Sequence, residues 1–170
     1  MTKQTKPKAD RPNIPGYGIA GVKEGKGLLP WSWAEKHLTK AENYMLSTTR
    51  PDRRPHVMPI WGVWHGGAFY FSTGATSVKA RNLAADPRCV LCPAQASESV
   101  IVEGVAEQVQ PAPSVGVAYF KKYKWKLDPN MGPIYAIRPR VAFGFIEADE
   151  LFTKTATRWV FHGKTKKGSK

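Results

Sequence analysis

Two β-rich segments joined by a glycine pair are the feature that most limits what this chain can fold into. The segments are "HVMPIWGVW" (His56–Trp64) and "AFYFST" (Ala68–Thr73), and only "HGG" separates them. Strands linked this closely run antiparallel, because parallel strands need a crossover of a dozen residues or more. Pro59 lacks the N–H that a central strand donates, so we expect the first segment at a sheet edge or a bulge. The middle of the chain therefore predicts an antiparallel sheet with an accessible edge.

Short apolar segments bounded by turn residues continue on both sides of this hairpin. They predict further strands at residues 44–49, 88–94, 99–110, 134–149 and 157–161. Segments with helical spacing predict helices at residues 29–43, 77–86 and 112–126, with Ser32 as a plausible N-cap of the first. Six or seven antiparallel strands with two or three inserted helices predict a mainly β fold and a small closed barrel.

The formal net charge is +13, and the two ends of the chain each carry about +4 of it. We therefore divide the chain into a flexible basic N-terminal arm (1–27), a barrel domain (28–162) and a basic C-terminal tail (163–170). The barrel domain itself stays basic, which favours anionic ligands. The stretch "YFKKYKWK" (119–126) raises nucleic-acid binding as an alternative, although a solvated helix face explains it more simply.

The sequence carries no motif that indicates membrane insertion, secretion or thiol redox chemistry. No segment reaches the roughly 18 apolar residues that a membrane span needs, and the first residues do not resemble a signal peptide. Cys89 and Cys92 form a C-x-x-C within a predicted strand, where positions i and i+3 point to opposite faces. We expect a cytoplasmic protein with buried, inert thiols and no membrane partner.

The loop between the second hairpin strand and the next helix is the first candidate site. In "FYFSTGATSVKARN" small hydroxyl residues precede a predicted helix start that carries Lys79 and Arg81. Free amides and the helix dipole favour an anion at such a place. On composition alone, however, Ser77 as a simple helix cap with solvated charges around it is the better explanation.

Three other features could carry chemistry. Both faces of "HVMPIWGVW" are apolar, so one face needs cover from a flat ligand or a partner chain. Arg158 and Trp159 in "ATRWVF" offer a charge and a flat ring, with burial of the tryptophan as the commoner outcome. His56 is the one histidine that we consider as a proton donor, and no metal-ligand spacing occurs.

The order of these segments resembles a known superfamily. "YMLSTTRPDRRPHVMPIWGVWHGGAFYFSTGATSVKARNLAADPRCVLCPA", then "VIVEGVAEQV" and "TRWVF", are similar to the pyridoxamine 5′-phosphate oxidase-like split β-barrels, closest to the flavin/deazaflavin oxidoreductase group B branch. The resemblance covers residues 31–161. It implies an FMN-binding type of split barrel and a homodimer with cofactor sites at the interface.

The resemblance also implies which residues meet the cofactor. The ring would lie along the strand matching "VMPIW", the phosphate at the loop and helix matching "STGATSVKARN", and the partner chain would add residues near its end. The positions carried over are Met58, Pro59, Ile60, Trp61, Ser72, Thr73, Ser77, Lys79, Asn82, Arg158 and Trp159.

Departures from the FMN-binding members favour a different cofactor. Val78 stands where those members carry an arginine, and His56 and Trp61 stand where they tend to carry basic residues. Ser99 falls near a glutamine that contacts FMN across their dimer. The tryptophan and the "ATRW" ending are typical of members that use the deazaflavin coenzyme F-420, whose polyanionic tail suits a basic protein.

The resemblance thus implies an oxidoreductase that transfers a hydride between coenzyme F-420 and a small unsaturated or quinone-like substrate. Two alternatives stay open: an FMN-dependent oxidase or reductase on the same fold, and a non-catalytic protein that binds a cofactor or a tetrapyrrole. His56 and Arg158 are the candidates for a catalytic group.

Overall fold

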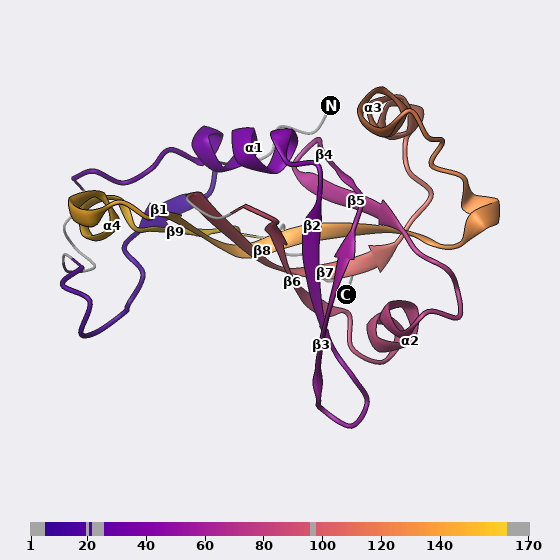
Figure 1. The fold of residues 1–170 in the computed structure, drawn as a ribbon, viewed down its shortest axis with the longest axis horizontal. Coiled ribbons are helices and arrows are strands. Elements are labelled where there is room, and N and C mark those ends of the chain that lie inside the picture. The colour runs from indigo at the N-terminus through magenta and orange to yellow at the C-terminus, as the bar shows by residue number, and fades with distance from the viewer. Residues whose placement is uncertain (1–5, 20, 22–25, 96–97, 163–170) are drawn as a thin grey trace, which may run out of the picture.

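A computed structural model describes residues 6–19, 21, 26–95 and 98–162 of the chain. Within these residues the protein is mainly β, with a nine-stranded antiparallel sheet and four α-helices at its margins (Figure 1). The strands are β1 (Lys8–Asp10), β2 (Tyr44–Thr49), β3 (Pro55–Ile60), β4 (Val63–His65), β5 (Ala68–Ser72), β6 (Arg88–Pro93), β7 (Glu98–Gln108), β8 (Ile134–Ile146) and β9 (Thr157–Val160). The helices are α1 (Trp31–Lys40), α2 (Val78–Ala85), α3 (Pro113–Tyr123), α4 (Asp149–Thr155) and the 3₁₀ helix η1 (Pro129–Met131).

The long strand β8 joins the two parts of the sheet. One part of β8 pairs with β5, another with β9, and β7 runs along its other edge. The pairings β3–β2–β6–β7–β8–β5–β4 return to their start, because β3 and β4 are consecutive in the chain. This path closes a barrel, and β9 and β1 extend the sheet beyond it.

Residues 56–64 form two strands, and the prediction of one long strand was wrong. β3 pairs with β2, β4 pairs with β5, and the chain changes partner at Trp61 and Gly62. A Cβ on Gly62 would lie 2.6 Å from the Tyr70 carbonyl oxygen and closer still to the Phe69 ring. Glycine therefore lets the chain pass close to β5 while it turns the corner of the barrel.

The N-terminal segment is partly built into the sheet. Lys8–Asp10 pair with β9, and Arg11 is buried, with its guanidinium donating to the carbonyl oxygens of Ala156, at 3.0 Å, and Lys26. A flexible arm is thus wrong for these residues, because buried side-chain contacts hold them. The division at residues 27 and 162 stays a prediction, and the tail 163–170 lies outside the described residues.

The helix starts agree only in part with the sequence. Ser77 caps α2 as expected, since its Oγ accepts from the Ala80 N–H at 3.1 Å. Ser32 is not a cap: Pro30 holds that position in α1 and makes no side-chain cap bond. Helix α4, which the sequence pattern does not predict, follows β8 and packs beside it.

An aromatic core fills the barrel and continues under α1. Tyr44, Phe69 and Phe71 are fully buried inside the barrel. Trp159 of β9 is also buried and lies edge-on to Trp31, with 5.3 Å between ring centroids. The apolar side of α1 thereby covers the face of the sheet from which the Trp159 side chain of β9 projects.

Candidate functional site

The edge strand β3 exposes unusually large apolar side chains. β3 pairs with β2 and ends the strand order, as Pro59 predicted. The exposed fractions of Val57, Met58 and Trp61 are 47%, 42% and 51%. Ile60 is buried, so it can offer a ligand only its backbone. An uncovered apolar strand of this kind marks a surface that a ligand or a partner chain can cover.

The hydroxyl groups of the loop before α2 are mostly engaged within the protein. Ser72 Oγ donates to the Pro133 carbonyl oxygen at 3.3 Å. The hydroxyls of Thr73 and Ser77 lie 3.1 Å apart, and one donates to the other. Since Ser77 also accepts from the Ala80 N–H, the pair keeps one hydroxyl hydrogen for a ligand. The loop can therefore hold an anion through that hydrogen, backbone amides and Lys79.

Helix α2 brings Lys79 close to His56 at the start of β3. Burial lowers the pKa of His56, and the charges of Arg50 and Lys79 lower it further. The hydroxyl of Thr48 lies 3.4 Å from His56 Nδ1. A lowered pKa keeps this imidazole neutral near pH 7, which suits a hydrogen-bond acceptor better than a proton donor.

Asn82 has a structural contact. Its side chain is 1% exposed and donates to the Thr48 hydroxyl at 2.9 Å, which ties α2 to β2. This contact fixes α2 against β2, the neighbour of the edge strand β3. The predicted ring strand and phosphate loop are thus neighbours, with Asn82 behind them.

The predicted residues near the chain end lie elsewhere. Trp159 is 1% exposed and donates from Nε1 to the Leu29 carbonyl oxygen, so it has no free surface for a ligand. Arg158 makes two hydrogen bonds of 2.8 Å to Asp10 of β1, which hold the pKa of that carboxyl below its usual range. Both belong to the β1–β9 side of the sheet, away from β3 (Figure 1).

Sequence reasoning missed a cluster at the barrel corner. Lys122 of α3 donates to Tyr44 Oη at 2.7 Å and to the Gly62 carbonyl oxygen at 3.1 Å. Burial lowers the pKa of Lys122 to about 8. Tyr123 stacks on Trp61 with 5.0 Å between ring centroids and an interplanar angle of 5°. Nothing in the local pattern distinguishes Lys122 from its neighbour Lys121, because only the fold turns it inward.

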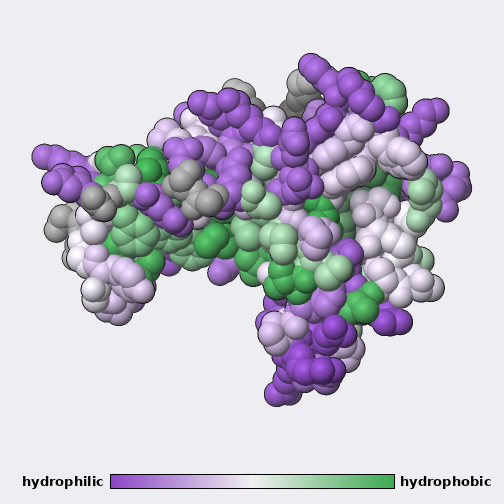
Figure 2. Space-filling view, in the orientation of Figure 1, coloured by the Kyte–Doolittle hydropathy of each residue, from purple (hydrophilic) through white to green (hydrophobic). Residues whose placement is uncertain are grey.

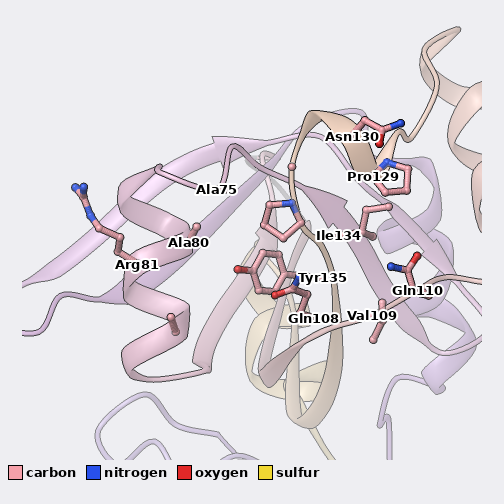
Figure 3. Close-up of a pocket in the computed structure, with 13 residues that line it drawn as sticks. Ala75, Ala80, Arg81, Gln108, Val109, Gln110, Pro129, Asn130, Ile134 and Tyr135 are labelled. Atoms are coloured by element: carbon pink, nitrogen blue, oxygen red, sulfur yellow. The ribbon is translucent and has the colours of Figure 1, made fainter.

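Two hollows lie on the surface, one beside α2 and one beside β2. One, of about 580 Å³, lies between α2 and η1 (Figure 3). Ala80 and Arg81 of α2 and Tyr135 of β8 are among the residues that line it. The other, of about 720 Å³, lies over β2, β6 and β7. None of the predicted cofactor-binding residues lines either hollow.

The thiol of Cys89 is buried, as the sequence predicts, whereas Cys92 is only partly buried. Cys89 and Cys92 are both free, and burial raises the pKa of Cys89 to about 12. A thiol with so high a pKa stays protonated and unreactive at neutral pH. Within the described part of the chain, no group of three or more metal-binding side chains comes together.

Comparison with known proteins gives a family model and similar folds. The family model described as pyridoxamine 5′-phosphate oxidase matches residues 34–163. No curated protein matches the chain. A conserved hypothetical protein of Mycobacterium tuberculosis superposes with a TM-score of 0.62 at 22% identity, over 73% of this chain and 89% of that one.

Two further similar structures belong to proteins whose names include a cofactor. A protein described as an F420 reductase has a TM-score of 0.53 at 25% identity, over 71% of this chain and 98% of that one. A heme-binding protein of Mycobacterium smegmatis has a TM-score of 0.56 at 21% identity, over 65% of this chain and 52% of that one. These likenesses agree with the split-barrel fold that the sequence predicts.

Proposed function

Because this chain belongs to the pyridoxamine 5′-phosphate oxidase family, we propose that it is an oxidoreductase that uses coenzyme F-420. It would transfer a hydride between that coenzyme and a small unsaturated or quinone-like substrate. A likeness to a structure described as an F420 reductase supports the cofactor. The substrate is proposed only as a class, since it follows from hydride chemistry rather than from a shaped pocket.

One observation carries this proposal: an uncovered apolar strand lies beside a helix start that holds a single lysine. Met58 of β3 and Trp61, which directly follows it, are exposed, and Lys79 lies close enough to shift the pKa of His56. Val78 beside Lys79 adds no charge. A terminal phosphate such as that of FMN is bound best by several cationic donors, and Val78 removes one such donor from this helix start.

The chain's own groups would bind and orient the cofactor. Exposed side chains of β3 and the backbone at Pro59 and Ile60 would face the flat ring, while Lys79 and the hydroxyl hydrogen of the Thr73–Ser77 pair would hold an anionic group. A bound reduced deazaflavin supplies a hydride. His56 and Arg158 make poor proton donors, because one is neutral and the other is paired with Asp10. We therefore expect water to supply the proton.

We propose that two chains cover the β3 surface together, with the cofactor between them. Val57, Met58 and Trp61 are too large and too exposed for a solvated edge. A homodimer would bury them and close a site that a single chain leaves open. Ser99 donates to Glu147 at 3.1 Å within the same chain.

A pair of titrations tests the cofactor. Coenzyme F-420 and FMN are added separately to the purified protein, and their fluorescence is followed. We expect micromolar binding of F-420 and at least tenfold weaker binding of FMN. Val78→Arg should strengthen FMN binding about tenfold by adding a charge-assisted contact, whereas Val78→Gln should not. Micromolar FMN binding by the wild type without F-420 binding would establish the FMN-dependent alternative.

Tetrapyrrole binding is the second candidate, because one observation favours it. The neutral imidazole of His56 lies on the apolar edge strand, and imidazole is a common haem ligand. A structurally similar protein is described as heme-binding. Haem added to the protein should then give a Soret band that His56→Ala shifts and His65→Ala leaves in place. If both variants match the wild type, His56 is not the haem ligand, and the absence of any Soret band in the wild type would exclude this candidate.

A further inference from the structure

The outer side of α3 combines exposed apolar residues with lysines. Val117, Phe120 and Trp125 are 69%, 48% and 53% exposed. Lysines stand among them, and all are solvent-exposed. The lysine-rimmed face, as we call it, consists of Val117, Phe120, Lys121, Lys124, Trp125 and Lys126. Figure 2 shows apolar and hydrophilic residues side by side over α3, at its upper right.

This face is hollowed, and lysines surround the hollow. A depression of about 520 Å³ is lined by Gly116, Val117, Phe120, Lys121, Lys124 and Lys126. No acidic residue is among these lining residues. The ligand or surface that fits here is therefore apolar where it meets Val117 and Phe120, and negatively charged around them.

The residues of the lysine-rimmed face do not belong to the contact between α3 and the barrel. The inner side of α3 packs Val115 and Tyr119 against Val63 of β4, and both are nearly fully buried. Lys122 also turns inward, to Tyr44. Lys124, Trp125 and Lys126 follow the end of α3 at Tyr123. Val117 and Phe120 lie within α3, at helical spacings that keep them on the side opposite to Val115 and Tyr119. Their apolar character thus has no explanation in the packing of α3 on the barrel.

Charge decides which partner suits the lysine-rimmed face. A second copy docked by the same face would bring six lysines together, in a protein of net charge +13. A nucleic-acid backbone would satisfy the lysines but would leave Val117 and Phe120 without apolar contacts. An anionic bilayer satisfies both, because acyl chains receive the apolar residues and headgroups receive the lysines.

We propose that the lysine-rimmed face docks the protein on the surface of an anionic lipid bilayer. Within the described residues no helix is long and apolar enough to cross a membrane. Lying on a surface needs only a short apolar face and nearby lysines. The lack of a spanning segment in the sequence therefore does not bear on docking at the surface.

Vesicle sedimentation with the full chain tests the proposal. Vesicles of phosphatidylcholine are compared with vesicles that also contain phosphatidylglycerol, at low and at raised salt. We expect binding to the anionic vesicles only, weakened by salt, with a blue shift of tryptophan emission that Trp125→Ser reduces. Phe120→Ser should weaken binding at least fivefold. Leu151→Ser, which removes an exposed apolar residue of α4 at the far end of the molecule, should not.

A matched charge control separates this face from general attraction. Lys121→Gln with Lys126→Gln should weaken vesicle binding more than tenfold, since each lysine near an anionic surface contributes about fivefold. Lys36→Gln with Lys40→Gln removes the same charge from α1 and should have a much smaller effect.

Three results would overturn the proposal: no binding to anionic vesicles, equal binding to neutral ones, or equal losses in the two double variants. Duplex DNA or RNA serves as the competing probe. Nucleic-acid binding that Lys121→Gln with Lys126→Gln abolishes, in a protein that ignores vesicles, would assign the face to nucleic acid instead.

Discussion

Lys122 illustrates how the fold gives one residue a chemistry that its neighbours lack. Three exposed lysines surround it in the sequence, yet its ammonium lies over the Tyr44 ring at 4.7 Å and donates to Tyr44 and Gly62. Its surroundings are neutral apart from Glu42, whose charge raises the pKa, so burial dominates and the pKa falls to about 8. The corner of the barrel thus contains a cation that is costly to keep charged.

This cost predicts a dependence of stability on pH. In the unfolded chain the Lys122 pKa returns to 10.5, so between about pH 8 and 10.5 the unfolded state binds more protons. The contribution of Lys122 therefore stabilises the folded state as pH rises through this range. After solvent screening of a half-exposed group, we expect about 1 kcal/mol.

Urea unfolding at several pH values measures this effect. The difference in unfolding free energy between wild type and Lys122→Met should move in favour of the wild type from pH 8 to 10.5. Lys126→Met serves as the control, because Lys126 is exposed. If the profiles of wild type and Lys122→Met stay parallel, the lysine is not desolvated.

The sequence predicts part of the candidate site at this scale and misses the rest. The cap at Ser77 and the edge position of Pro59 follow from rules about single residues, and both are confirmed. The burial of Trp159 and the pairing of Arg158 with Asp10 depend on contacts across 130 and 148 residues. No local pattern predicts such contacts, and the cofactor roles of the carried-over residues stay predictions.

Among the elements, the corner between β3 and β4 depends on one glycine. Gly62→Ala should lower the free energy of unfolding by about 2–4 kcal/mol, because the added methyl group overlaps Phe69 and the Tyr70 carbonyl. Gly116→Ala in α3 meets nothing within 4 Å and should instead stabilise by about 0.5–1 kcal/mol. Thermal and urea unfolding compare the two. A well-tolerated Gly62→Ala would mean that the corner can shift.

The β1–β9 pairing predicts what Arg158 does. Arg158→Ala should loosen Lys8–Asp10 and speed hydrogen exchange in that strand, without weakening cofactor binding. Asp10→Asn should loosen the same strand to a smaller extent, since one hydrogen-bond acceptor remains. Loss of cofactor binding in Arg158→Ala, but not in Asp10→Asn, would instead support the cofactor role that the family resemblance implies.

Element types were easier to predict than element limits. All seven predicted strand regions are strands, because their β-branched and aromatic residues alternate between turn residues. The described residues contain nine strands because Gly62 divides one predicted region into β3 and β4, and because Lys8–Asp10 form an additional strand. β1 has no apolar pattern of its own, and it exists because β9 offers it an edge.

For the whole molecule, the exposed β3 surface predicts a dimer. Sedimentation should give twice the chain mass of 18.9 kDa. Met58→Glu should favour monomers and should also weaken cofactor binding, because a charge would be buried at the interface. Met131→Glu, at another exposed methionine on η1, should change neither. A wild-type monomer that binds cofactor fully would contradict a shared site.

The pairing of β1 with β9 also affects how the protein is made. Asp10 leaves the ribosome 148 residues ahead of Arg158, its partner in the finished sheet. During synthesis the early segment must wait, unpaired, while the barrel strands are translated and assemble without it. β1 is therefore among the last strands to be placed, and its backbone groups stay open to a wrong neighbour until β9 has been made.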